Sequence, residues 1–428
     1  MNNQVNTQRN YLGPFLTMVF LFLIVGFLTT ANGQFQGPLK AVFLADAGQW
    51  KNTLATLISF SWFLAYPLCG NIGAQWIGKY GYKETLIRGL LVMIMGLALF
   101  FMSSGYTVMF PESSLDFPGL QVPAGFLIFL CGSFVAGASA TILQVVINPY
   151  LTACQVRGTQ PIQRMAIGGT ANSVGTTVAP YFVSGIMFGG LAMENVQVEQ
   201  LMLPFAIMMS VVAIVILVLL KLSLPDVIQE TRRQGDKETG RQGERSVWSF
   251  RHLTFGVIAI FFYVGCEVCI GTNINLFALE DLDMEISTIT LMATLYWGGL
   301  LVGRLAGSSL STVSPRSQLT FTTVCAACLV LIAMMTDNPW ILVAVGLFHS
   351  IMWGAVFTLS VAHLGKYTAK ASGVFMIGVI GGAILPLLQG MIADWLGSWR
   401  WSWSLVFTGE LVMLFYALVG SKVVQQAE

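Results

Sequence analysis

The feature that most constrains this chain is a series of long apolar segments, each able to cross a lipid bilayer. A membrane-spanning helix needs about 20 apolar residues to cross a hydrocarbon layer of ~30 Å. Such segments lie near residues 12–32, 53–75, 85–104, 123–149, 163–189 and 200–222, and then near 252–278, 286–309, 317–336, 339–362, 370–392 and 401–421. The pattern predicts an all-α membrane protein with twelve transmembrane helices in two six-helix bundles.

The composition favours a bilayer over water as the main solvent. Of the 428 residues, 55% are hydrophobic and 10% are charged, whereas soluble domains carry about 25% charged residues. A formal net charge of +1 gives no electrostatic reason to expect nucleic acid as a partner. Two CxxC pairs, Cys266-Cys269 and Cys325-Cys328, supply two ligands each, and no nearby His or Cys completes a metal site. Without a catalytic triad or a phosphate-binding loop in a polar context, we expect no enzyme activity, metal or cofactor.

A polar gap divides the chain into two halves. Residues 225–251 are rich in charges and poor in apolar residues, so we expect a cytoplasmic linker between one bundle at 1–224 and another at 252–428. With the N-terminus inside, Lys40, Lys51 and Arg400 are the only basic residues on the outer side. This bias predicts cytoplasmic termini, and the first apolar segment is expected to remain as a helix because no cleavage signal follows it.

Ionisable residues at membrane depth mark candidate functional sites, because placing a charge there costs at least about 2.5–3.5 kcal/mol. Three lie mid-span: Glu267, His349 and Glu410. We interpret Glu267 as a ligand of a cation or of sugar hydroxyls; the alternative is a protonated carboxyl bonded to a neighbouring helix. His349 is equally compatible with a proton carrier and a neutral hydrogen-bond donor. Glu410 is interpreted as structural, because the last helix of such a bundle is expected at its periphery.

Uncharged polar residues at depth suit a neutral polyol, because amides and indoles offer paired donors and acceptors and a flat apolar face. Any of them can instead join helices, at about 0.6 kcal/mol on average, and a tryptophan can anchor at the lipid interface. Asn148-Pro149 is also expected to break its helix near the cytoplasmic end. The candidates are Asn32, Gln34, Gln36, Gln144, Asn148, Asn172, Asn273, Asn275, Trp297 and Trp353.

Several stretches around these residues carry a family pattern. They are GPLKAVF (37–43), TILQVVINPYL (141–151), ANSVGTTVAP (171–180), FFYVGCEVCIG (261–271), YWGGLLVGRLAGS (296–308), VGLFHSIM (345–352) and LGKYTAKASGVFMIGVIGGAILPLLQGMIADWLG (364–397). Together they resemble the fucose/glucose/galactose permeases, which are sugar:cation symporters of the major facilitator superfamily. The resemblance implies two rocking six-helix bundles and import of a neutral hexose with protons or sodium.

The resemblance also implies roles for particular residues. Polar positions of the family that would line the central cavity match Gln144, Asn148, Asn172 and Glu267. Glu267 is the one family-matched carboxylate left at depth and is therefore the candidate for ion coupling. Gate candidates are Arg304, at the cytoplasmic end of the eighth helix, and the loop at 78–83, which contains Lys79.

Departures from the family pattern bear on the substrate. An Asn-Asp pair of the relatives is Asn32-Gly33 here, and an Arg-x-Asn stretch followed by Gln is Arg164, Ala166 and Gly169. In the tenth helix His349 stands for Asn, and Trp353-Gly354 stands for Phe-Pro. A buried hydroxyl left unpaired costs about 1–3 kcal/mol. The lost side chains therefore favour a bulkier, acylated or oligomeric neutral sugar over plain fucose or galactose.

Two other functions stay open on the sequence. One is a major facilitator exporter of amphipathic small molecules, which would suit a roomy apolar cavity. The other is a sugar sensor that does not transport, although the linker and the tail after Lys422 are short. The expected partners are a sugar, a proton or sodium ion and the lipid of a cell inner membrane, and we expect a monomer.

Overall fold

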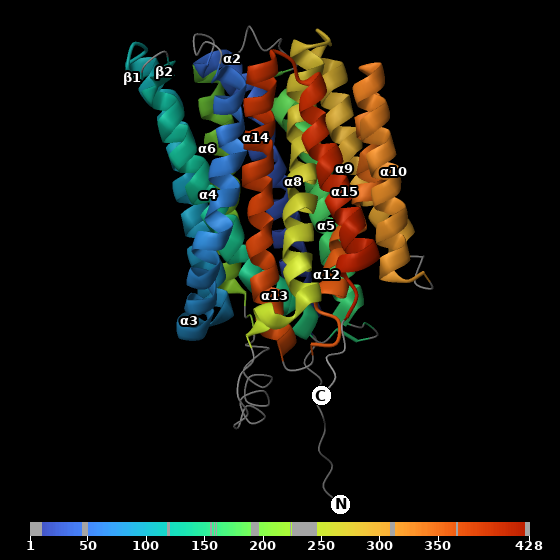
Figure 1. Cartoon of the computed structure of the whole chain (residues 1–428). Coiled ribbons are helices and arrows are strands. Elements are labelled where there is room, and N and C mark those ends of the chain that lie inside the picture. The colour runs from blue at the N-terminus through green and yellow to red at the C-terminus, as the bar shows by residue number, and fades with distance from the viewer. Residues whose placement is uncertain are drawn as a thin grey trace, which may run out of the picture.

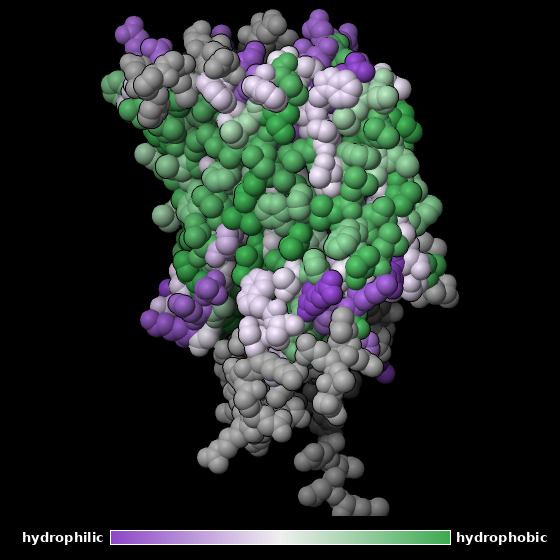
Figure 2. Space-filling model, viewed as in Figure 1, coloured by the Kyte–Doolittle hydropathy of each residue, from purple (hydrophilic) through white to green (hydrophobic). Residues whose placement is uncertain are grey.

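The computed structural model describes residues 11–44, 50–117, 120–154, 156–157, 159, 161–189, 197–222, 224, 246–308, 313–364 and 367–423. The described residues form a bundle of long helices that run in nearly the same direction (Figure 1). On the face seen in Figure 2 a broad hydrophobic band separates hydrophilic residues at the two ends of the bundle. Such a band is the surface that a helical bundle presents to lipid.

The first half of the chain contributes the following elements. They are α1 (Leu12–Gln34), α2 (Gln36–Phe43), α3 (Lys51–Met109), β1 (Ser114–Phe117), β2 (Leu120–Pro123), α4 (Ala124–Ala153), α5 (Pro161–Tyr181), the π-helical η2 (Phe182–Met187), the 3-10 turn η4 (Val198–Leu201) and α6 (Met202–Lys221). The strands β1 and β2 form an antiparallel hairpin in which Ser114 pairs with Pro123. We call the end of the bundle that carries α2 and this hairpin the α2 end; it is uppermost in Figure 1.

The second half contributes a similar series. It consists of η5 (Val247–Ser249), α8 (Arg251–Glu280), α9 (Ile286–Ser308), α10 (Pro315–Thr336), α11 (Pro339–His349), α12 (Met352–Ser360), α13 (Thr368–Phe375), η7 (Met376–Ile380), α14 (Gly381–Leu396), η8 (Arg400–Trp403), α15 (Ser404–Phe415) and η9 (Tyr416–Gly420). Residues 225–245 of the expected linker lie outside the described residues. The division of the chain into two bundles at that linker stays a prediction.

The described helices agree with the expected apolar segments. Nine are long and apolar enough to span a bilayer alone, and α11 with α12, bent by 42°, make a tenth span. α3 contains two expected segments, because its 59 residues pass through a kink at Gly81, where φ is 79°. Only glycine adopts that φ readily. The segment expected at 163–189 corresponds to α5 with η2, so the fold is consistent with twelve crossings.

One local expectation was wrong. Asn148-Pro149 was expected to break its helix, but α4 continues through Pro149 to Ala153. The turn after the proline keeps its helical bonding, since the Cys154 N–H donates to the Tyr150 carbonyl at 2.8 Å. In membrane helices, neighbouring groups can satisfy the carbonyl that a proline frees, so a single proline does not have to end the helix.

The two halves pack through several helix pairs, and one hydrophobic core cluster includes residues of both halves. α3 lies against α14, α5 against α9, and α1 against α8. Glycines let two of these pairs approach closely. A Cβ built at Gly33 of α1 would lie 2.5 Å from Thr272 Cγ2 of α8, and one at Gly390 of α14 would lie 2.8 Å from Thr56 Oγ1 of α3. At both positions a larger side chain would push the halves apart.

Candidate binding and coupling site

Polar contacts join the two halves at the α2 end. The Lys40 ammonium pairs with Glu280, at the end of α8, and donates to the Asn52 side-chain oxygen. The Asp394 carboxylate of α14 accepts from the Asn52 N–H at 3.1 Å and from the Thr53 N–H at 2.6 Å. Trp50, at the N-cap of α3, gives that helix no side-chain cap. Asp394 therefore caps α3 from the other half of the molecule.

A second layer of contacts lies deeper in the bundle. Gln34 Nε2 donates to the Gly271 carbonyl at 3.0 Å, and Asn275 Nδ2 donates to Gln34 Oε1 at 2.6 Å. Beside them Gly33 faces Thr272 with no room for a side chain. In this arrangement a carboxylate at position 33, as in the resembling family, would collide with α8. Gln34 thus contacts α8 directly, and the two halves are in contact at the α2 end.

Several predicted site residues keep polar atoms available at different depths of the bundle: Asn275 lies five residues from the α2 end of α8, and Asn148 lies five residues from the opposite end of α4. Gln144 and Asn148, one turn apart on α4, are half-buried, and Gln144 Nε2 donates to Tyr66 Oη at 2.6 Å. Among the buried atoms without a hydrogen-bond partner in the described part of the chain, four belong to candidates predicted from the sequence: Gln36 Oε1, Asn148 Oδ1, Asn275 Oδ1 and Trp297 Nε1. An unpaired buried polar group costs about 1–3 kcal/mol. A ligand that carries hydroxyl groups would supply partners for Asn275 Oδ1 and Trp297 Nε1, because Trp297 packs on Gly271, one turn before Asn275 on α8.

Two further predicted residues lie beside Tyr263. Glu267 is half-buried on α8, and its carboxylate lies beside the Tyr263 hydroxyl. Trp353 is half-buried on α12, and its ring lies edge-on to Tyr263, with centroids 6.3 Å apart. A flat indole face next to amide groups is the combination that a sugar ring binds.

Three other predicted binding residues are used within their own half. Asn32 Oδ1 accepts from Ser133, Asn172 Nδ2 donates to the Phe22 carbonyl at 3.0 Å, and Asn273 Nδ2 donates to Gln389 Oε1 at 3.0 Å. These bonds connect α1 with α4 and α5, and α8 with α14. The geometry favours the interhelical alternative for all three, and their role as ligands stays a prediction.

His349 and Glu410 form a buried pair in the second half. Both side chains are fully buried, and His349 Nε2 lies 2.6 Å from Glu410 Oε1. Tyr296 Oη lies 3.0 Å from His349 Nδ1, and Tyr263 Oη donates to the His349 carbonyl at 3.0 Å. Neither tyrosine was predicted from the sequence, although Tyr263 precedes Glu267 by one helical turn and Tyr296 adjoins Trp297.

The two predicted gate residues differ in their contacts. Arg304 Nη1 donates to Ser173 Oγ at 2.6 Å and to the Gly169 carbonyl at 3.2 Å, so it joins α9 to α5 of the other half. Lys79 is exposed, and its ammonium lies 5.0 Å from the ring of its neighbour Tyr80. The gate assignment is thus supported by a contact between the halves for Arg304, whereas the contact of Lys79 stays within its own helix.

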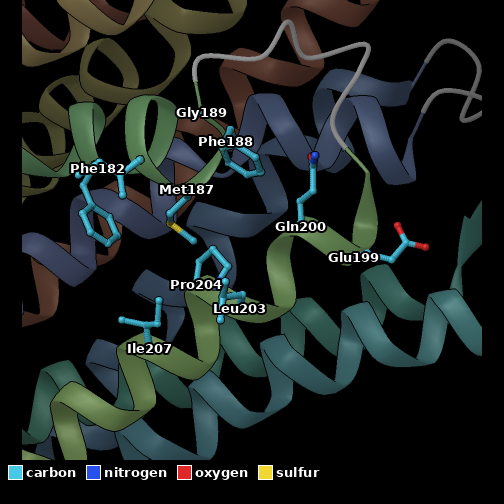
Figure 3. A pocket seen from close by; sticks show the side chains of 10 residues that line it. Phe182, Met187, Phe188, Gly189, Glu199, Gln200, Leu203, Pro204 and Ile207 are labelled. Carbon is cyan, nitrogen blue, oxygen red and sulfur yellow. The ribbon is translucent and has the colours of Figure 1, made fainter.

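A cavity of about 560 Å³ lies elsewhere, between η2 and the start of α6 (Figure 3). Its lining is mainly apolar and comes from the first half alone, with Glu199 and Gln200 as its polar members. None of the predicted site residues lines it, so it is not the candidate site. The described part of the chain also holds no group of His, Cys, Asp and Glu fit to bind a metal ion.

The sequence of this chain matches one protein family and several known transporters. Residues 22–379 match the family profile of the Major Facilitator Superfamily. A glucose/galactose transporter of Brucella abortus biovar 1 (strain 9-941) is 30% identical over 434 residues, which cover 99% of this chain and 97% of the relative. The L-fucose-proton symporter of Escherichia coli (strain K12) is 23% identical, covering 93% of this chain and 91% of the relative.

Solved structures show the same fold. The inward open xylose transporter of E. coli superimposes with a TM-score of 0.72 at 14% identity, covering 97% of each chain. The E. coli fucose:proton symporter superimposes with a TM-score of 0.63 at 20% identity, covering 96% of this chain and 98% of that structure.

Proposed function

Because this chain belongs to the Major Facilitator Superfamily, we propose that it is a secondary active transporter that imports a sugar by cation symport with alternating access. Relatives named as glucose/galactose transporters and as L-fucose-proton symporters support the substrate class and favour protons as the ion. The observation that carries the proposal is the pair of unpaired amide and indole atoms at membrane depth, Asn275 Oδ1 and Trp297 Nε1, which lie around Gly271 of α8, where Gln34 of the first half bonds to Gly271 and Asn275.

The chemistry of these atoms suits a neutral polyol. They provide one donor and one acceptor, which sugar hydroxyls can match because each hydroxyl both donates and accepts. Glu267 and Trp353, which both contact Tyr263, add a carboxylate for hydroxyl groups and an aromatic face for the ring. Gln144 would complete the site from α4.

We propose a sugar larger than a simple hexose, such as an acylated one. A Cβ built at Gly169 would meet no atom within 4 Å, so the position at which relatives carry a longer side chain borders open space. Gly169→Gln should therefore reduce transport of an N-acetylated hexose more than transport of the parent hexose. Gly13→Gln is the matched control, because a Cβ there also meets nothing within 4 Å and the residue lies at the start of α1. Equal losses for both sugars at Gly169 would contradict the proposal on size.

Glu267 is proposed as the residue through which the ion is coupled. It is half-buried, and the Tyr263 hydroxyl beside it also lies next to the Arg304 guanidinium. Glu267→Gln should leave exchange of labelled sugar across vesicles largely intact and abolish accumulation against a gradient. Unchanged accumulation would reject this role.

The orientation in the membrane is proposed from the charge bias. An even number of crossings returns the chain to its starting side, and the Lys/Arg bias places that side in the cytoplasm. The α2 end, where Lys40 and Asp394 connect the halves, would then face outward. We also propose that the protein lies in the inner membrane of a bacterium, carries a sugar together with a cation, and acts as a monomer.

The direct test is counterflow of labelled sugars in vesicles reconstituted with the purified protein. Vesicles loaded with an unlabelled sugar should take up the same labelled sugar transiently, and only transported members of a panel should do so. Ligand binding without flux would favour the sugar sensor. Flux restricted to amphipathic cations or drugs, driven outward, would favour the exporter.

A further inference from the structure

The His349–Glu410 pair is a second place, besides Glu267, where an ionisable group lies at membrane depth. Neither side chain reaches solvent, and Nε2 and Oε1 are 2.6 Å apart. The other carboxylate oxygen, Oε2, has no hydrogen-bond partner among the described residues. A carboxylate that was merely structural would be expected to use both oxygens, because each unpaired one costs free energy when buried.

The hydrogen bonds around this pair determine how many protons it holds. Tyr296 Oη donates to the Glu267 carbonyl at 3.1 Å and lies 3.0 Å from His349 Nδ1. A hydroxyl has one hydrogen, so with that hydrogen on the carbonyl, Nδ1–H must donate to Tyr296 Oη. A second proton must then lie between Nε2 and Oε1, because two lone pairs at 2.6 Å would repel. In this arrangement the pair is neutral overall.

Removing one proton leaves one other consistent arrangement. Tyr296 then turns its hydrogen from the Glu267 carbonyl to Nδ1, and Nε2–H donates to an ionised Glu410. The pair now has a net charge of −1 in a fully buried position, with Oε2 unpaired. Isolated buried charges are strongly disfavoured. The two states thus differ by one proton and by the partner of the Tyr296 hydroxyl.

The groups that face the pair do not offset such a charge directly. α8 contributes Tyr263, Cys266 and Glu267, of which Cys266 Sγ donates to the Val406 carbonyl. α9 contributes Tyr296 and Arg304. Arg304 Nε donates to the carbonyl of Ser350, the residue after His349, and Arg304 Nη1 donates to Ser173 of α5. α10, which packs on α11 and α15, carries Cys325, Cys328 and Arg316, and Arg316 binds the Ala417 and Leu418 carbonyls. Each cation on these helices therefore has other partners.

We propose that the His349–Glu410 pair is the position at which the transported proton is bound. This inference rests on the proposed symport function and deepens it, because it separates the site of proton binding from Glu267. Glu267, which is half-buried, passes the proton between water and the pair, and the hydroxyls of Tyr263 and Tyr296 lie between them. Proton loss also releases Tyr296 from the Glu267 backbone, so proton occupancy changes the segment of α8 that faces the sugar.

The test is equilibrium binding of a transported labelled sugar to the purified protein across a pH series, in sodium-free buffer. For wild-type protein the dissociation constant should rise about tenfold per pH unit above the titration point of the pair, as one coupled proton requires. Glu410→Gln keeps the size and neutrality of the protonated pair, so its dissociation constant should change less than about twofold over the same series. His349→Asn should also be insensitive to pH, because Glu410 alone in that position would stay protonated.

Two further variants separate the outcomes. Glu112→Gln, an exposed acid between α3 and β1, should retain the wild-type pH profile. Glu267→Gln should also retain it at equilibrium, although accumulation is lost, because the pair still titrates. If Glu267→Gln abolishes the pH dependence and Glu410→Gln preserves it, the proton binds at Glu267; this result overturns the inference and leaves symport intact.

Sodium-dependent, pH-independent binding by wild-type protein would also overturn the inference. Failure of wild-type protein to bind or transport any sugar would instead reject the proposed function. Should Glu410→Gln fail to fold, as judged by gel filtration and thermal unfolding, His349→Asn decides the question in the same assay.

Discussion

Asp394→Ala should open the α2 end of the molecule. The carboxylate accepts two backbone N–H groups of the first turn of α3 and the Thr53 hydroxyl, at 3.1, 2.6 and 2.6 Å. Each hydrogen bond to a charged group contributes about 1.5–3 kcal/mol, and an anion at a helix N-terminus adds roughly 0.3–1 kcal/mol. These contributions overlap, and water replaces part of them in the open state.

We therefore expect the substitution to remove about 2–4 kcal/mol of the preference for contact at the α2 end. At 1.4 kcal/mol per tenfold change, the ratio of open to closed molecules should rise roughly 30-fold to 700-fold. Asp394→Asn retains one oxygen acceptor without the charge, so it should produce a smaller change in the same direction. The fold itself should survive, because α3 and α14 each keep their packing within their own half.

The assay is a distance measurement between spin labels attached to cysteines introduced at Glu112 and Thr336. Both residues are exposed near the α2 end, one in each half. The exposed Cys131 and Cys328 would be replaced first. Glu285→Ala is the matched control, because Glu285 accepts from Ser287 of its own half. A folded Asp394→Ala protein whose distance distribution equals that of wild type would refute the reasoning.

Three further changes test the contacts between and around the halves. Gly33→Ala should lower sugar uptake because its methyl meets Thr272 Cγ2, and Thr272→Ala in the same chain should restore uptake; no rescue would contradict direct contact. Trp297→Phe keeps an aromatic ring but loses the unpaired Nε1–H. The sugar dissociation constant should therefore rise by about 5- to 150-fold, equivalent to 1–3 kcal/mol. Unchanged sugar binding would show that Trp297 is not part of the site. Lys40→Met should lower the free energy of unfolding by about 3 kcal/mol, because Glu280 loses its partner. Adding Glu280→Gln in the same chain should recover most of that loss. Additive losses in the double variant would contradict the pairing of Lys40 with Glu280.

The helices could be predicted because their cause is local. A run of about 20 apolar residues must form hydrogen bonds within itself in lipid, whatever surrounds it. Gly81 shows the limit of this reasoning, since the sequence indicates two spans there while the backbone continues through both in one helix. Pro149 shows another, because whether a proline ends a helix depends on neighbours that a single chain segment does not specify.

The contacts of the site depend on residues far apart in the chain, and the sequence gives no register for them. Asp394 caps a helix whose first turn lies more than three hundred positions earlier, so nothing near either residue indicates the bond. Glu410 was interpreted as structural from the expected place of its helix, but the side chain points inward to His349. Asn273 is predicted as a ligand from its depth alone, and nothing near it in the sequence indicates its bond to Gln389.

Ion movement driven by sugar tests the central claim most directly. Vesicles that contain the protein, without any imposed ion gradient, would receive a transported sugar from outside while an external dye reports pH. Symport predicts that the medium becomes more alkaline as protons enter with the sugar, that sugars excluded from counterflow have no effect, and that Glu267→Gln abolishes the signal. Sugar flux at the wild-type rate without movement of protons or sodium would contradict the account.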